Sequence, residues 1–295
     1  MRLPRLADLY VCWYPARCCI LLFLFVITAS RAFAQNDSGV ECRFWSKPYI
    51  RSFPLRGGYK LKLTHIEPAK ETGCHAVVLS PKGESIFTDQ EWDISLHAKD
   101  IDIDGDGRAD LILRGYSGGA HCCWTYWIVT PSKRPALRKK IENQRHVDFE
   151  DLNRNGTITW LAQDGSFDYF DGLCHACTPF PELYLKMEGD RIIDISPQYL
   201  SHYDDEIKAA RFRLIHEHLE DFIAARNEQQ ISRVAENVKP LVLTVVLAYL
   251  YSGREQQAWK ALDEMWPRFD RPRIRRLIVE TRSKGLLRYV DKKSK

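Results

Sequence analysis

Beyond its N-terminal segment, this sequence has few long apolar runs. The longest, residues 241–251, is too short to cross a bilayer, so we expect no transmembrane segment after the N-terminal one. The sequence also lacks a strong excess of charge, with a formal net charge of +4 over 295 residues. The N-terminal pattern described below indicates export, and an exported protein rarely meets nucleic acid, so we expect no nucleic-acid partner.

A complete catalytic motif is also missing. Ser117 and His121 are near neighbours, but no G-x-S-x-G elbow surrounds the serine. Acidic side chains could act as the acid and base of a secreted hydrolase, although the sequence places no two of them at catalytic distance. The candidates for that alternative are Glu91, Asp93, Asp164, Asp168 and Asp171. We therefore assign no catalytic residue, and the sequence favours a protein without its own catalysis.

The N-terminal segment has the pattern of a secretory signal peptide. Arginines precede an apolar run at 19–28, and Ala32-Phe33-Ala34 forms an A-x-A cleavage site. The run is too short for a spanning helix. We expect a signal peptide at 1–34, cleavage after Ala34, and a periplasmic or secreted protein.

Export changes the interpretation of the cysteines. The mature chain keeps an even number, which in an oxidising compartment indicates up to three disulfides. We expect one disulfide between the first two cysteines. We expect two more that join the two adjacent cysteines to the two cysteines of the C-x-x-C motif. In chain order these residues are Cys42, Cys74, Cys122, Cys123, Cys174 and Cys177.

The last four cysteines allow two other functions. Together with His121 and His175 they could bind zinc, although adjacent cysteines are poor ligands for one ion. The motif Cys174-His175-Ala176-Cys177 could instead carry out thiol–disulfide exchange. Two prolines, Pro179 and Pro181, follow it and argue against the helix that usually carries such a motif.

Residues 102–110, with the sequence DIDGDGRAD, form the most informative motif. Carboxylates recur at alternate positions, and a glycine permits a sharp turn. Oxygen-only ligands in this spacing are typical of Ca²⁺. The expected ligands are the side chains of Asp102, Asp104, Asp106 and Asp110 together with the carbonyl of Arg108.

A weaker copy of this motif lies 49 residues downstream, at 151–159. Neutral oxygens replace three of the carboxylates, so we expect weak Ca²⁺ binding or a structured turn only. A fixed period of this size indicates a repeat. The corresponding oxygen donors are Asp151, Asn153, Asn155, Thr157 and Thr159.

These two segments resemble the FG-GAP/VCBS repeat family, in which a D-x-[DN]-x-D-G-x-x-D loop joins strands of β-propeller blades and binds Ca²⁺. The resemblance is specific over 102–116 and weaker over 146–162. It implies blade-like antiparallel sheets with Ca²⁺ as the cofactor. Only two copies are visible, whereas a closed propeller needs at least four blades, so we expect no full propeller.

The hydrophobic period divides the mature chain in two. Residues 35–203 contain short strand-like runs between turn signals and predict a mainly β, antiparallel domain. From residue 204 to about 290 the apolar spacing becomes helical and predicts an all-α domain. Within it, we expect Pro240 to begin a helix. Tyr249, Gly253, Ala258 and Leu262 give a weak resemblance to a tetratricopeptide helix pair.

Charge is divided in the same way. The formal net charge is −4 over 35–203 and +5 over 204–295, and eleven basic residues follow residue 267. We expect a basic tail at 291–295 and a C-terminus able to contact an anionic surface. The leading hypothesis is an exported, Ca²⁺-stabilised binding or scaffold module for a protein or glycan partner. The secreted hydrolase and the thiol–disulfide or zinc-handling protein are the alternatives.

Overall fold

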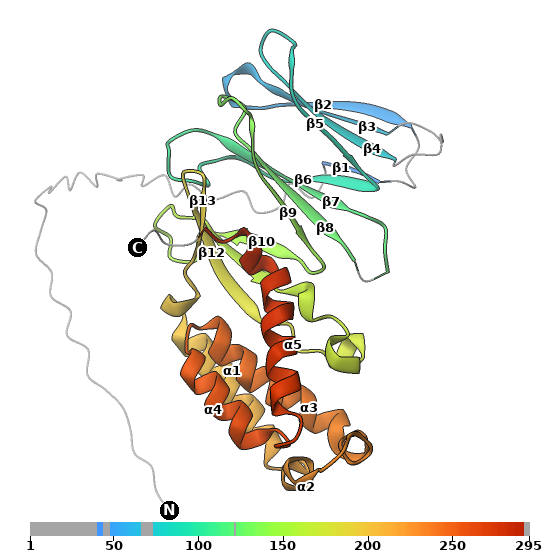
Figure 1. Ribbon diagram of the computed structural model, residues 1–295. Helices are drawn as coiled ribbons and strands as arrows, with labels where there is room; N and C mark the ends of the chain where they lie inside the picture. Colours follow the sequence, from blue (N-terminus) through green and yellow to red (C-terminus); the bar gives the residue numbers. More distant parts are fainter. Residues whose placement is uncertain (1–39, 44–47, 66–72, 121, 292–295) are drawn as a thin grey trace, which may run out of the picture. The chain divides into compact units, whose positions relative to one another are not determined.

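The computed structural model describes residues 40–43, 48–65, 73–120 and 122–291 (Figure 1). The expected signal peptide, His121 and residues 292–295 lie outside this part. Residues 34–295 form one compact unit. Antiparallel sheets fill its N-terminal part and helices its C-terminal part, without a closed barrel, which confirms the predicted fold class.

Each of the three sheets contains four strands that follow one another in the chain. The first sheet has the order β2-β3-β4-β5, the second β1-β6-β7-β8-β9, and the third β10-β11-β12-β13. Three such units fall short of the four blades of the smallest propeller. The strands are β1 (Glu41–Cys42), β2 (Tyr49–Pro54), β3 (Lys60–His65), β4 (Cys74–Leu79), β5 (Ser85–Glu91), β6 (Asp93–Ile101), β7 (Asp110–Tyr116), β8 (Trp124–Val129), β9 (Leu137–Asn143), β10 (Val147–Glu150), β11 (Thr159–Gln163), β12 (Glu182–Glu188) and β13 (Arg191–Asp194).

The second sheet is buried on both faces, because successive side chains of a strand point to opposite sides. Leu111 and Leu113 of β7 join a core cluster with the first sheet. Ile112, which lies between them, joins a second cluster with the third sheet and the helices. This double burial explains why residues 111–113 are continuously apolar rather than alternating.

The helices follow without a break from the third sheet. Their bounds are α1 (Leu200–Leu214), α2 (Leu219–Ala224), α3 (Glu228–Tyr251), α4 (Glu255–Met265) and α5 (Arg271–Lys284), followed by the short 3-10 helix η6 (Leu286–Tyr289).

The prediction that Pro240 begins a helix is wrong, because the proline lies inside α3. Proline removes one backbone hydrogen bond from a helix. The residues that follow it, such as Val242 and Leu243, are fully buried, and this packing outweighs the lost bond.

The third sheet and the helices share one hydrophobic core. Tyr203 of α1 is fully buried, and its hydroxyl donates a hydrogen bond to the Glu182 carbonyl at the start of β12, at 2.8 Å. The Tyr184 and Tyr199 rings stack with their centroids 4.0 Å apart. The predicted change from strands to helices therefore occurs within one core. The division into two separate domains, 35–203 and 204–290, stays a prediction.

The C-terminal residues dock onto the edge of the third sheet. The Asp291 backbone N–H donates to the Ile192 carbonyl at 2.9 Å, and the Asp291 carboxylate accepts the Ile192 N–H at 2.8 Å. These bonds cover part of the exposed edge of β13. The predicted basic tail at 291–295 thus begins with a docked residue. Among the described residues, no helix is long and apolar enough to cross a membrane.

Candidate functional site

The acidic loop connects β6 to β7 and is organised around Asp102. Its carboxylate accepts backbone N–H groups from Gly105 at 2.8 Å, Asp106 at 3.0 Å and Gly107 at 2.8 Å. Gly107 has a φ of +79°, a conformation that glycine adopts without strain. The sequence pattern therefore folds into the expected tight turn.

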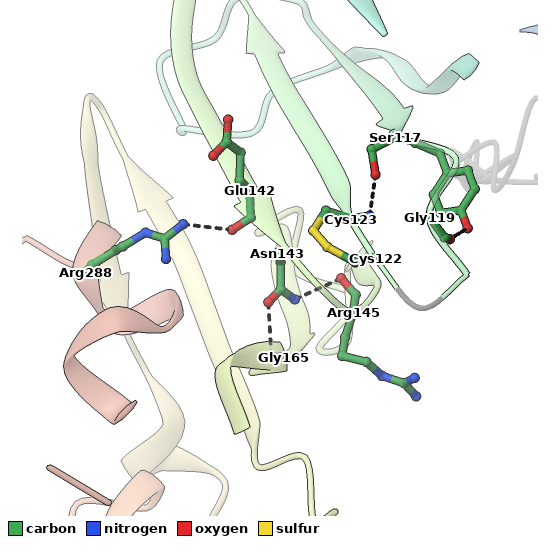
Figure 2. Close-up of a disulfide and its surroundings, with 10 residues drawn as sticks. Ser117, Gly119, Cys122, Cys123, Glu142, Asn143, Arg145, Gly165 and Arg288 are labelled. Carbon is green, nitrogen blue, oxygen red and sulfur yellow. Dashed lines mark hydrogen bonds between the residues drawn. A yellow bond between two sulfur atoms is a disulfide. The ribbon is translucent and has the colours of Figure 1, made fainter. Parts of the chain in front are cut away.

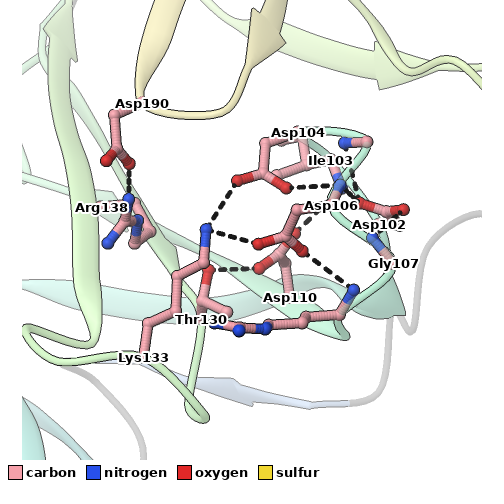
Figure 3. Close-up of polar contacts among 12 residues, drawn as sticks. Asp102, Ile103, Asp104, Asp106, Gly107, Asp110, Thr130, Lys133, Arg138 and Asp190 are labelled. Atoms are coloured by element: carbon pink, nitrogen blue, oxygen red, sulfur yellow. Dashed lines mark hydrogen bonds and ion pairs between the residues drawn. The ribbon is translucent and has the colours of Figure 1, made fainter.

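Three carboxylates converge in this loop (Figure 3). One oxygen from each of Asp102, Asp104 and Asp106 lies within 4.8 Å of the other two. Lys133, from the turn between β8 and β9, places its ammonium 3.1 Å from Asp104 and 2.5 Å from Asp106. The hydrogen bond to Asp106 is the main reason why the pKa of Lys133 is raised.

Asp110 has a different position from the other three. It is buried, and its carboxylate accepts hydrogen bonds from the Ile103 N–H at 2.9 Å and from the Thr130 hydroxyl. Burial raises its pKa to about 6. Its contacts fasten the base of the loop to β8. The roles of Asp110 and of the Arg108 carbonyl as metal ligands stay predictions.

The chemistry of the loop fits a hard cation. All of the converging donors are oxygens, which Ca²⁺ prefers, and the ammonium of Lys133 already lies against two of them. Carboxylates this close repel one another, and a positive charge between them lowers that repulsion. Lys133 was not among the predicted site residues, because nothing in the sequence around a lysine in a distant hairpin turn indicates that it reaches this loop.

The second loop, between β10 and β11, repeats the backbone pattern of the first. Asp151 accepts the Asn155 N–H at 3.0 Å and the Gly156 N–H at 2.8 Å. Asn155 then accepts the Thr157 N–H at 2.9 Å, as Asp106 accepts the Arg108 N–H. Both loops precede the second strand of a sheet unit, so the two loops occupy equivalent places in their sheets, and a sequence repeat stays a prediction.

The second loop differs in its charge. Asn153 donates its side-chain amide to the Tyr199 hydroxyl at 3.4 Å, and Thr159 is buried at the start of β11. In the part of the chain that the structure describes, three acidic or thiol ligands converge only at the first loop. The second loop forms a turn, and Ca²⁺ binding there stays a prediction.

A cleft of about 170 Å³ lies beside the first loop, between the first and second sheets. Arg56 and Tyr59 line it from the first sheet, and Arg108 and Pro131 line it from the second. The Arg56 N–H donates to the Asp100 carboxylate across the cleft at 3.0 Å. The cleft therefore has one exposed arginine on each side, and Arg108 belongs to the acidic loop itself.

The disulfides differ in part from the expected pairing. The expected Cys42–Cys74 disulfide is present, and it joins β1 of the second sheet to β4 of the first sheet. The expected crossing pairs are wrong for this structure, because adjacent cysteines pair with each other (Figure 2) and the C-x-x-C cysteines close their own short turn. That turn is a single 3-10 turn, which holds its two cysteine Cα atoms only 5.0 Å apart. All six described cysteines are paired, so this structure contains no thiolate for a zinc site in its described residues.

The candidate hydrolase carboxylates have separate partners. Asp164 is fully buried and accepts the Tyr251 hydroxyl at 2.7 Å, while Asp171 forms ion pairs with Lys239 and Arg273. Asp168 lies 2.8 Å from a nitrogen of His175. At the other end of the β region, Glu91 accepts the N–H of the next residue, and Asp93 pairs with Tyr116 in the sheet. The contacts of Asp164 and Asp171 tie the segment between β11 and β12 to α3 and α5.

No protein-family model, curated protein or solved structure matches the chain.

Proposed function

We propose that this protein is an exported, Ca²⁺-stabilised binding or scaffold module without its own catalysis. The observation that carries the proposal is the convergence of Asp102, Asp104 and Asp106 in a loop whose backbone pattern recurs 49 residues later. Such loops brace the second strand of a sheet unit and leave its surface free for a partner. The FG-GAP/VCBS resemblance supports the same function.

The compartment follows from the N-terminal pattern and the cysteines. Residues 1–34 read as a signal peptide, and paired cysteines are typical of oxidising compartments. Extracellular Ca²⁺ is abundant enough for sites of modest affinity. Sequencing the N-terminus of the exported protein should find Gln35 as its first residue.

We infer that the partner contacts the cleft beside the acidic loop. Its volume of about 170 Å³ is below the roughly 300–1,000 Å³ of drug-sized pockets, so it suits one small group of a larger partner. Arg56 and Arg108 favour a carboxylate, as found on acidic sugars and acidic side chains. Tyr59 adds an amphipathic ring on the same side of the cleft as Arg56.

Calorimetric titration of ion-stripped protein tests the metal site. We expect about one Ca²⁺ per chain, loss of binding in Asp104→Ala, and nearly unchanged binding in Asp151→Ala. For the partner, binding to an array of acidic and neutral glycans should favour the acidic ones and weaken in Arg56→Ala but not in Arg276→Ala, a control on α5. Equal binding by both variants would exclude the cleft.

A further inference from the structure

Two of the three disulfides, Cys42–Cys74 and Cys174–Cys177, differ in their access to solvent. Both cysteines of Cys42–Cys74 are fully buried. Cys174 is exposed and its partner Cys177 is only partly buried. Thiol–disulfide exchange begins when a thiolate reaches one of the two sulfurs, so access decides which bond can react. The C-x-x-C disulfide is therefore open to attack at Cys174.

A histidine lies within the same turn. His175 directly follows Cys174, and its Nδ1 lies 2.8 Å from the Asp168 carboxylate. Its ring is flanked by Tyr169 and Phe180, with centroid separations of 5.9 Å and 5.7 Å. The carboxylate and the two rings hold the imidazole in one orientation. Imidazole groups beside a cysteine favour its thiolate and supply protons to leaving thiolates.

The surrounding segment does not need the disulfide to keep its place. The Asp171 carboxylate accepts two hydrogen bonds from the Arg273 guanidinium, at 2.6 Å and 3.1 Å, and lies 2.5 Å from the Lys239 ammonium. Buried Asp164 accepts the Tyr251 hydroxyl and the Leu286 N–H. These contacts anchor the segment to α3, α5 and η6, so the bond can open while the fold remains.

We propose that Cys174–Cys177 is a redox-active disulfide that oxidises a dithiol on a partner protein. This activity goes beyond the binding function proposed above and does not use the acidic loop. A partner thiolate attacks the Cys174 sulfur, a mixed disulfide forms, and the Cys174–Cys177 bond breaks with its electron pair on the Cys177 sulfur. That sulfur takes a proton, and we assign its delivery to His175 in the same turn.

The second half-reaction restores the balance. The partner's other thiolate attacks its own sulfur in the mixed disulfide, and Cys174 leaves as a thiolate that takes up a proton. Two electrons and two protons have then passed from the partner to this chain. The partner holds a new disulfide, and Cys174 and Cys177 are thiols. Asp168 acts as a positioning residue for His175.

The first experiment uses Cys42–Cys74 as an internal standard. The mature, folded protein is placed in one reducing glutathione buffer, quenched in acid at intervals, and alkylated before mass spectrometry of each cysteine peptide. Because access sets the rate of attack, we expect Cys174–Cys177 to open at least a hundredfold faster than Cys42–Cys74, while the circular dichroism stays native. Opening of both bonds together, or only with loss of structure, would overturn the proposal.

The second experiment locates the attacked sulfur. Cys177→Ser leaves Cys174 free, and Cys174→Ser leaves Cys177 free. Oxidised glutathione should modify Cys174 in the first variant at least tenfold faster than it modifies Cys177 in the second. Equal rates would overturn the assignment of Cys174 as the reacting sulfur.

The third experiment tests the histidine. We expect His175→Gln and Asp168→Asn to slow the reduction of the wild-type disulfide severalfold and to change its pH profile. His218→Gln serves as a control, because His218 is exposed and its Nδ1 also lies beside a carboxylate, 3.5 Å from Asp221. A pH profile in His175→Gln identical to that of the control would overturn the role of His175.

Discussion

Asp102 and Asp151 occupy equivalent positions in two loops of the same construction. Each carboxylate accepts the N–H groups of the residues four and five positions further on, with matching distances of 3.0 Å and 2.8 Å. The loops differ in what surrounds this shared frame. Around Asp102 two further carboxylates converge, whereas around Asp151 the corresponding side chains are amides.

Removing either carboxylate should destabilise its loop, because several backbone N–H groups lose their acceptor. Hydrogen bonds to charged groups contribute about 1.5–3 kcal/mol each, so we expect Asp102→Ala and Asp151→Ala each to lower the free energy of unfolding by about 2 kcal/mol in the absence of Ca²⁺. Urea denaturation measures the change. Asp205→Ala, an exposed position in α1, is the matched control and should change stability by less than about 0.5 kcal/mol. If Asp151→Ala changes the free energy of unfolding no more than the control does, the hydrogen bonds of Asp151 do not stabilise the fold.

Lys133 should compete with Ca²⁺ for the acidic loop. Its ammonium contacts Asp104 and Asp106 and must move away before the ion can take their oxygens. We expect Lys133→Met to tighten Ca²⁺ binding roughly tenfold, about 1.4 kcal/mol. In the absence of Ca²⁺ the same variant should be less stable, because the carboxylates then repel without compensation. Lys140→Met, on the neighbouring strand, should leave the affinity unchanged, and a similar gain in that variant would point to a general charge effect.

The sequence predicts much of this arrangement and misses specific parts. The strand-like runs 59–66, 123–130 and 182–188 predict strands, and β3, β8 and β12 lie there, while the motif at 102–110 predicts the tight acidic turn. The sequence did not predict the contact of Lys133 with the loop, because that contact depends on how two hairpins of one sheet lie together.

The disulfide pairing was mispredicted for a related reason. Cysteine spacing alone does not say which loops approach one another, and two of the three bonds turn out to be local. The helix through Pro240 was missed because local propensity is outweighed by burial of the residues that follow it. Contacts between distant segments are what single-sequence patterns fail to encode.

Glu206 should make stability depend on pH. Burial, followed by the nearby Glu182 carboxylate, raises the pKa of Glu206 to about 7, whereas His202 lowers it. In the unfolded chain the group loses its proton near pH 4.5, but in the folded protein it keeps the proton until about pH 7. The folded state therefore binds more protons in this window, and its stability falls as the pH rises from 4.5 to 7.

Glu206→Gln should flatten that slope. We expect the variant to be more stable than the wild type at pH 8 by about 2 kcal/mol and nearly equal to it at pH 4. Chemical denaturation across this pH range measures both. Glu220→Gln, at an exposed position in α2, provides the comparison. A wild-type slope that persists in Glu206→Gln would assign the pH dependence to another group.

The shared core predicts that the third sheet and the helices unfold together. Leu243 of α3 and Leu185 of β12 are buried in the same cluster. Leu243→Ala should cost about 3 kcal/mol and should lower the hydrogen-exchange protection of β12 as well as that of α3. Leu61→Ala, in the cluster of the first sheet, is the control for a remote cavity. If α3 loses its hydrogen-exchange protection in Leu243→Ala while β12 keeps its own, the result would support two independently folding domains.

We propose that Ca²⁺ stabilises this fold through Asp102, Asp104 and Asp106. The most direct measurement is the melting temperature of ion-stripped protein as Ca²⁺ is added, in the wild type and in Asp104→Asn. Binding to the folded state alone stabilises it by about 2.7 kcal/mol at a hundredfold excess over the dissociation constant. We predict a melting temperature that rises with Ca²⁺ in the wild type, returns to its starting value with EDTA, and stays constant in Asp104→Asn. A wild-type melting temperature that is the same with EDTA and with excess Ca²⁺ would contradict the account.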